Sequence, residues 1–283
     1  MLKKIFFISI MSVLIISCDK EQIVKTNYNS EVPYSYGSNY HDYSALWNSN
    51  NPIDSIGYWH NVFMDSLKTR RDEISTTNVS QFFNSIYNIL KTSAVNLNMD
   101  TTGYYTGTHN IINCDTIDFQ EYHSIFTDTI TINLHSQIVE ILIDVDSQLE
   151  VIPAINTIKS IENQIGSLNI TNNEKQALYG ATSVAKFSLK YWNDEIVGGI
   201  GTSEWIEDEE HSNSLWVELG TVALSDMLGY YSGFTYGLNP QMGIVGAATS
   251  SATTAIYFWG DSIWDGIKEV GNWLWKGIKS IFK

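Results

Sequence analysis

Basic side chains are scarce in this sequence. The 283 residues include 16 Lys and Arg but 31 Asp and Glu, which gives a formal net charge of −15 at pH 7. Nucleic-acid binding depends on many Lys and Arg contacts to phosphates, so this acidic balance argues against a nucleic-acid partner. The charge favours solubility and has no bearing on the fold.

The N-terminus lacks an apolar run long enough to cross a bilayer, which requires roughly 20 apolar residues in a helix. Ile5–Ile16 is the apolar stretch there, and it is too short. Lys3 and Lys4 precede it, and the small residue Ser17 follows it. A basic start, a short apolar run and a small residue are typical of a secretory signal peptide, so we expect residues 1–17 to be removed on export.

Cys18 stands directly after this segment, in the sequence Ile15-Ile16-Ser17-Cys18. An aliphatic residue, an aliphatic or small one, a small one and then cysteine resemble the lipobox of bacterial lipoproteins. The resemblance implies that Cys18 receives diacylglycerol and further acyl chains such as palmitate, and becomes the mature N-terminus. The alternatives are an ordinary cleaved signal with a chance cysteine, or a buried N-terminal helix.

The residues that follow extend this resemblance. Asp19–Gln22 are similar to the acidic segment after the lipidated cysteine in surface lipoproteins of the Bacteroidota. The Asn-, Ser-, Ile- and Tyr-rich body, including Gly57–Asn61, also resembles uncharacterised lipoproteins of that phylum. The resemblance implies an outer-membrane location, with the cell surface as one face to test, and it brings no activity. Each buried CH₂ contributes about 0.8 kcal/mol, so several acyl chains would hold the protein on a membrane.

Cysteine itself is nearly absent, because Cys114 is the only other one. With Cys18 lipidated, Cys114 has no partner for an internal disulfide. We interpret it as a buried thiol that behaves as a small apolar side chain rather than as a catalytic nucleophile. Removal of Lys3 and Lys4 with no acid changes the formal net charge from −15 to −17.

The composition divides the mature chain into three regions. Residues 18–52 are rich in Asn, Ser and Tyr and poor in aliphatic residues, which predicts a flexible tether because little apolar surface can be buried. Residues 53–199 are expected to form a helical body, and residues 200–283 a Gly-rich helical hairpin followed by an amphipathic helix. The predicted fold class is therefore mostly α.

Apolar stripes at helical spacing support the helices of the body. The expected starts are Asn51-Pro52, Ser80, Pro153, and the capping box of Thr171 and Glu174. Ile130, Ile132 and Leu134 instead alternate with polar residues, which is the period of a strand. The following run, Ile138–Val145, is too uniformly apolar for its periodicity to decide, and we interpret it as a helix.

No catalytic motif emerges. No two of the histidines fall three or four residues apart on an expected helix; they are His41, His60, His109, His123, His135 and His211. Glu207–Glu210 before His211 are acids that could bind a divalent cation, but adjacent acids more often form a solvated loop. In Gly229–Gly233 the serine stands fourth, whereas the G-x-S-x-G motif of a hydrolase elbow has it third. We predict no enzyme and no cofactor or metal, and interpret His60 as a hydrogen-bonded histidine at the edge of the core.

Residues 227–260 contain no charged side chain, and small residues recur at every fourth position on either side of Asn239-Pro240. They are Ser225, Gly229, Gly233 and Gly237, then Gly243, Ala247, Ser251 and Ala255. Residues i and i+4 share one face of a helix, so each half presents a ridge where another helix can come close. We predict a tight antiparallel hairpin in the core. Membrane insertion is the alternative, although serines and threonines leave the segment only marginally apolar.

Residues 260–283 form an amphipathic pattern in which all ionisable side chains after Glu269 are lysines. Trp and Lys on such a helix suit a bilayer interface. The candidate membrane contacts are Trp264, Trp275, Lys276, Lys279, Phe282 and Lys283. Docking of the apolar stripe on the body is the favoured interpretation, because lysines also stabilise the C-terminus of any helix.

Together these patterns predict an exported, lipid-anchored envelope or surface protein that acts by interaction, with an unidentified protein partner. The membrane is its predicted partner through Cys18, and the C-terminal helix is a second candidate contact with the bilayer. The alternative is a membrane-active effector of bacteriocin or toxin type that acts through residues 213–283. An enzyme whose residues are assembled only by the fold is the third class.

Overall fold

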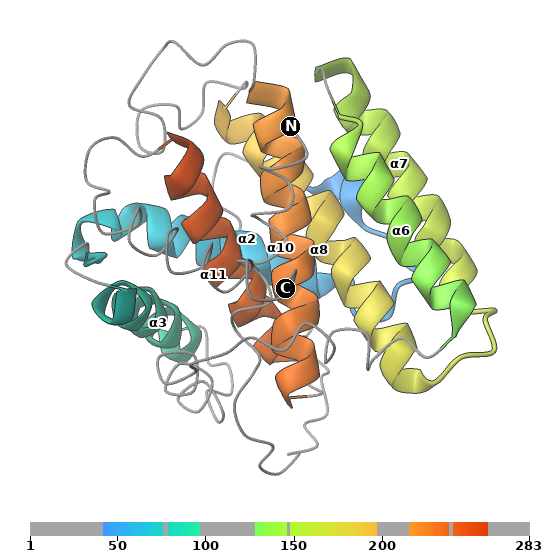
Figure 1. Cartoon of the computed structure of the whole chain (residues 1–283), viewed down its shortest axis with the longest axis horizontal. Coiled ribbons are helices and arrows are strands. Elements are labelled where there is room, and N and C mark those ends of the chain that lie inside the picture. The colour runs from blue at the N-terminus through green and yellow to red at the C-terminus, as the bar shows by residue number, and fades with distance from the viewer. Residues whose placement is uncertain are drawn as a thin grey trace, which may run out of the picture.

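The computed structural model describes residues 42–75, 79–96, 128–145, 148–196, 215–237 and 240–259. Within these ranges the chain forms α-helices and two 3₁₀ helices, Ser44–Leu46 and Arg71–Glu73, and contains no strand (Figure 1). The α-helices are α2 (Ser55–Thr69), α3 (Val79–Asn96), α6 (Thr129–Ile143), α7 (Gln148–Ile165), α8 (Asn172–Ile196), α10 (Leu215–Gly237) and α11 (Pro240–Trp259). The predicted mostly α fold is confirmed for this part of the chain.

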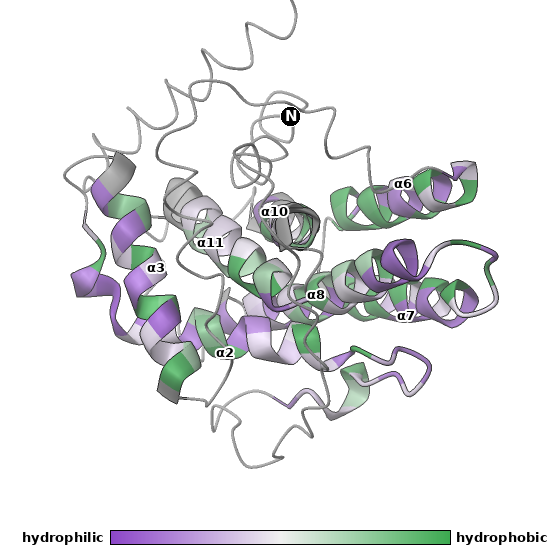
Figure 2. Ribbon diagram, turned by 90° about the horizontal axis from the view of Figure 1, so that it is seen from below, coloured by the Kyte–Doolittle hydropathy of each residue, from purple (hydrophilic) through white to green (hydrophobic). Residues whose placement is uncertain are grey.

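The helix α8 occupies the centre of the fold. It contacts α2, α6, α7, α10 and α11, and residues 177–189 are buried on every side. The pair α6 and α7 lies along one flank and α3 along the other, with α10 and α11 between them (Figure 1). Hydrophilic and hydrophobic residues alternate around the outer helices α3, α6 and α7 (Figure 2), which is the pattern of a helix with one buried face.

The predicted hairpin is confirmed as α10 and α11, which pack more extensively on each other than any other pair of described helices. A Cβ added to Gly229 would lie 2.6 Å from the carbonyl oxygen of Gly246, and one added to Gly233 would lie 2.0 Å from that of Met242. The two backbones therefore approach as the small residues predict, although Gly246 was not part of the predicted ridge. Among the described helices, none combines the length and the apolar character that spanning a membrane requires.

Two helices begin elsewhere than predicted. The helix α2 begins at Ser55, not at Pro52, because the intervening residues form turns closed by hydrogen bonds to the third residue back: the Asp54 N–H donates to the Asn51 carbonyl at 3.3 Å and the Ile56 N–H to the Ile53 carbonyl at 3.0 Å. The helix α7 begins at Gln148 and contains Pro153 in its interior, near its start. The predicted apolar stripes and the capping box of Thr171 and Glu174 are confirmed.

The strand-like alternation at residues 130–134 was misleading. These residues lie in α6, which begins after Asp128, whose side chain accepts a hydrogen bond of 2.8 Å from the Ile130 N–H. Leu134 and Ile138 are buried at helical spacing, whereas Ile130 and Ile132 are exposed. The N-cap and the stripe that faces the body therefore override the local period of two.

Part of the predicted tether packs on the body. Within residues 42–52, Tyr43, Leu46 and Asn51 are buried. Other predicted features lie outside the described residues: Cys18, Cys114, the acids Glu207–Glu210 with His211, and the candidate membrane contacts from Trp264 to Lys283.

Candidate functional site

Ionisable side chains gather inside the fold where α2 meets α8. Asp54 directly precedes α2 and His60 lies within it, Lys186 lies on α8, Glu162 comes from α7 and Asp226 from α10. All of them are buried. They form two groups: the lysine cluster of Asp54, Glu162 and Lys186, and the histidine–aspartate pair of His60 and Asp226.

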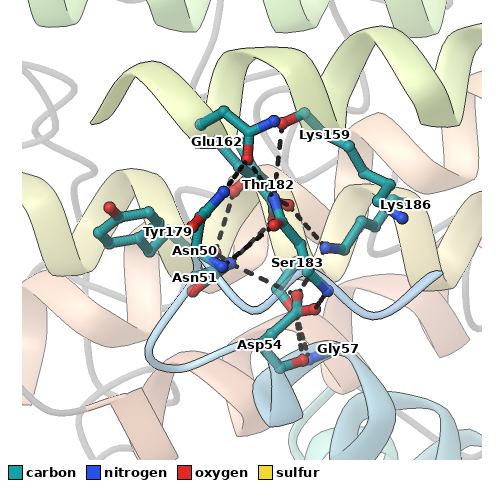
Figure 3. A network of polar contacts seen from close by, with 12 residues as sticks. Asn50, Asn51, Asp54, Gly57, Lys159, Glu162, Tyr179, Thr182, Ser183 and Lys186 are labelled. Atoms are coloured by element: carbon teal, nitrogen blue, oxygen red, sulfur yellow. Dashed lines mark hydrogen bonds and ion pairs between the residues drawn. The ribbon is translucent and has the colours of Figure 1, made fainter. Parts of the chain in front are cut away.

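In the lysine cluster, one ammonium group faces two carboxylates. Lys186 Nζ lies 2.6 Å from Asp54 Oδ1 and 2.7 Å from Glu162 Oε2, and the side chains of Lys186 and Glu162 are fully buried (Figure 3). The cluster joins the start of α2 to α7 and α8. With both acids ionised it carries one surplus negative charge, which needs further donors because buried charge without hydrogen bonds is costly.

Two asparagines of the segment before α2 supply these donors. Asn48 Nδ2 donates to Glu162 Oε2 at 2.9 Å, and the Asn48 backbone N–H donates to Asp54 Oδ2 at 2.7 Å. Asn51 Nδ2 donates to Glu162 Oε1 at 2.8 Å and to the Tyr179 carbonyl at 2.9 Å. Neutral amides therefore stabilise the carboxylates and fasten residues 48–51 to the body.

The start of α2 lies very close to α8. The Gly57 N–H donates to Ser183 Oγ at 2.9 Å, and that hydroxyl donates to the Asp54 carbonyl at 2.7 Å (Figure 3). A Cβ on Gly57 would lie 2.4 Å from the Ser183 carbonyl oxygen. The stretch Gly57–Asn61, which carries part of the sequence resemblance, is thus the place where the two helices meet.

Burial shifts the pKa of one acid in the lysine cluster. It raises the pKa of Asp54 from 3.8 to about 6, with the charge of Glu162 acting in the same direction and the Lys186 ammonium opposing. The folded state therefore becomes more stable relative to the unfolded chain as the pH falls from about 6 towards 3.8 and Asp54 becomes protonated.

The second group lies one to two turns further along α2. His60 Nε2 lies 3.4 Å from Asp226 Oδ2, and both side chains are fully buried. The hydroxyls of Ser188 and Ser251 donate to the same carboxyl oxygen, the latter at 2.8 Å. Trp192 Nε1 donates to Ser251 Oγ at 3.2 Å. Side chains from α2, α8, α10 and α11 therefore converge on one carboxyl group.

The neighbouring Asn61 sets the tautomer of His60. Asn61 Nδ2 donates to the Phe187 carbonyl at 2.9 Å, so its Oδ1 is the atom that faces His60 Nδ1 at 2.9 Å. We assign the hydrogen of the neutral imidazole to Nδ1 from this network. His60 Nε2 is thus left to face Asp226.

Desolvation shifts both members of the pair towards their neutral forms. It lowers the pKa of His60 from 6.5 to about 4, against the hydrogen bond that His60 donates to Asn61. It raises the pKa of Asp226 from 3.8 to about 8, against the hydrogen bonds from Ser188, Ser251 and Trp192. Burial therefore favours a neutral imidazole beside a neutral carboxyl group in the core.

The structure changes two interpretations of the sequence. His60 is hydrogen-bonded, as predicted, but it lies at the centre of the fold rather than at the edge of the core. Gly229–Gly233 lies inside the continuous helix α10, so the strand-turn-helix geometry of a hydrolase elbow is not formed there. Among the described residues, no group of three or more His, Cys, Asp or Glu is arranged to hold a metal ion.

Sequence reasoning missed Asp54, Glu162, Lys186 and Asp226. Lys186 lies on a helix whose polar composition predicts one exposed face, yet that part of α8 is buried all round. The available signal was Asp226, which is the last charged residue before the uncharged segment 227–260. No family model, curated protein sequence or solved structure matches the chain.

Proposed function

We propose that the protein is a lipid-anchored envelope lipoprotein of the outer membrane whose helical body acts by binding another protein. The observation that carries the proposal is the N-terminal sequence, in which a basic start and a short apolar run end in Ile15-Ile16-Ser17-Cys18. Lipid at Cys18 would hold the body beside a membrane, and the folded part begins by residue 43.

Exposed apolar side chains on one flank support a role in binding. Leu149 is 87% exposed and Ile152 is 52% exposed near the start of α7, and Ile130 and Ile132 are exposed on α6. Four of the five large apolar side chains most exposed in the described residues thus belong to this one helix pair. Leu149 and Ile152 lie three residues apart and so share one face at the start of α7, and exposed apolar side chains that lie together in this way commonly mark protein contacts.

The close packing of α10 on α11 bears on the membrane-active alternative. Gly229, Gly233 and Gly246 are needed where the two helices touch inside the body. Packing therefore accounts for the small residues of this segment without lipid. We accordingly favour binding over bilayer disruption as the function.

The anchor is tested by replacing Cys18 with alanine. In cells fed an alkyne analogue of palmitate, we expect the natural chain to become labelled and to partition into the detergent phase, because acylation requires the cysteine thiol. The Cys18→Ala chain should lose both properties, and Cys114→Ala should keep them. A labelled Cys18→Ala chain, or an unlabelled natural chain, would show that the lipobox assignment is wrong.

The binding flank is tested by a photo-crosslinking amino acid at position 149. We expect a discrete protein adduct in intact cells, because Leu149 projects from the flank that carries the exposed apolar residues. The matched control is position 164, which is exposed on the same helix near its other end. Equal adducts at both positions, or none at position 149, would count against the start of α7 as the binding surface.

A further inference from the structure

Asp226 provides a buried polar link between the α10–α11 hairpin and the helices α2 and α8. Its carboxyl group contacts Ser188 of α8, Ser251 of α11 and His60 of α2. Its Oδ1 atom is buried and has no hydrogen-bond partner, and the same is true of His60 Nε2. Both side chains are buried, and each has one atom without a hydrogen-bond partner. The number of protons on the pair therefore decides whether it contains an uncompensated charge.

The hydrogen bonds around the pair leave room for one proton, which the two side chains share. Because Nδ1 of His60 is engaged by Asn61, a proton of the pair lies either on Asp226 or on His60 Nε2. These two positions correspond to two forms of the pair with the same number of protons. One form is a neutral acid beside a neutral imidazole, and the other is a carboxylate beside an imidazolium. With no proton, the pair would be a buried carboxylate without a counter-ion, and with two it would be a buried imidazolium without one.

Other ionisable groups near the pair are engaged elsewhere. On α8, the uncharged Ser188 donates to Asp226 directly and Trp192 donates to Ser251, which in turn donates to Asp226, while Lys186 on the same helix is paired with Asp54 and Glu162. The helix α11 contains no charged residue. On the side towards α6, Tyr231 packs against the ring of His135 with centroids 5.2 Å apart.

We propose that His60 and Asp226 form a one-proton latch, which fastens the α10–α11 hairpin to α2 and α8 while the pair holds one proton and loosens it when that proton is lost. The latch is independent of lipidation at Cys18. It makes the hairpin, rather than the outer helices, the part of the body that responds to mildly alkaline conditions.

The direction of the pH dependence follows from counting protons. In the unfolded chain, His60 and Asp226 titrate near 6.5 and 3.8, and in the folded chain near 4 and 8. Between about pH 4 and 6.5 the folded and the unfolded pair each bind one proton. Stability is therefore constant in this range, since the loss from His60 as the pH falls is offset by the gain from Asp226. Between 6.5 and 8 only the folded pair keeps its proton, so stability falls as the pH rises.

Hydrogen exchange of the full-length chain at pH 6.5 and 8.5, expressed as protection relative to intrinsic rates, tests the latch. We expect α10 and α11 to lose protection about tenfold at the higher pH, as the linkage over these pKa values requires. The helix α7, which supplies no side chain to the pair, serves as the internal reference and should lose less protection than the hairpin, because its amides also exchange by local openings that leave the pair intact. In Asp226→Asn, which has no proton to lose, protection of the hairpin should not change. Asp54 does not interfere, because its pKa of about 6 lies below this window.

Nuclear magnetic resonance of isotope-labelled His60 in the unmodified chain provides a second measurement that does not depend on a variant folding. We expect the imidazole signals to stay constant between pH 5 and 7 and to respond near pH 8, when its neighbour ionises. Titration of His60 near its ordinary value would overturn the proposal. So would an equal loss of protection in α7, or the same tenfold loss in Asp226→Asn.

Discussion

Replacing Lys186 with methionine is expected to lower the free energy of unfolding by about 3–5 kcal/mol, because removal of one partner leaves buried charges uncompensated. Lys186 Nζ lies within 2.7 Å of two carboxylates, and the three side chains are almost completely shielded from water. Methionine conserves most of the volume, so the loss measures the missing ammonium group and not a cavity. Urea unfolding at pH 7, followed by circular dichroism, gives the difference.

The matched control is Lys190→Met on the same helix. Lys190 pairs with Asp194 one turn further along α8, but its side chain is 21% exposed, so water replaces the ammonium group there. We expect a loss of about 0–1 kcal/mol for this partly exposed pair. If Lys186→Met lost no more than Lys190→Met, the lysine cluster would not hold the start of α2 on α8.

The loss of stability in Lys186→Met should also depend on pH, and its direction follows from the pKa of Asp54. Without the ammonium group, the pKa of Asp54 rises above its value of about 6, because Lys186 is the main influence that lowers it. The carboxyl groups can then bind protons and become neutral as the pH falls. The difference between Lys186→Met and the natural chain should therefore shrink between pH 7 and pH 5.

The helices could be predicted from the sequence where one apolar stripe faces the body. Ile155, Ile158 and Ile161 are an example, and all three are buried. The capping box of Thr171 and Glu174 likewise marks the start of α8, since its two reciprocal hydrogen bonds are local. Prediction failed at residues 130–134, where burial at helical spacing outweighed the local alternation.

The candidate site could not be predicted, because its contacts join residues far apart in the chain. Asp54 and Lys186 meet only when α2 packs on α8, and nothing near Lys186 in the sequence indicates that its charge is buried. His60 was recognised as a hydrogen-bonded residue, yet its neighbour Asp226 comes from α10. Periodicity locates the faces of helices, but the pairing of faces from different helices depends on packing over the whole molecule.

Replacing Gly233 with alanine is expected to lower the free energy of unfolding by about 2–3 kcal/mol, although alanine favours helix formation by about 1 kcal/mol. The added Cβ would lie 2.0 Å from the Met242 carbonyl oxygen and 2.7 Å from its carbonyl carbon. These are backbone atoms, so the overlap can be relieved only by moving α10 away from α11. Thermal and urea unfolding of the two chains provide the measurement.

The control is Gly166→Ala, just after the end of α7. There the nearest atom to an added Cβ is the Tyr179 hydroxyl oxygen at 3.1 Å, which lies at the end of a side chain and can shift. We expect a change within about 0.5 kcal/mol, as for surface substitutions generally. An unaltered stability of Gly233→Ala in the absence of lipid would mean that the hairpin does not pack within the body, and the membrane-active alternative would then account better for residues 227–260. A loss confined to Gly233→Ala would show that these small residues serve the fold.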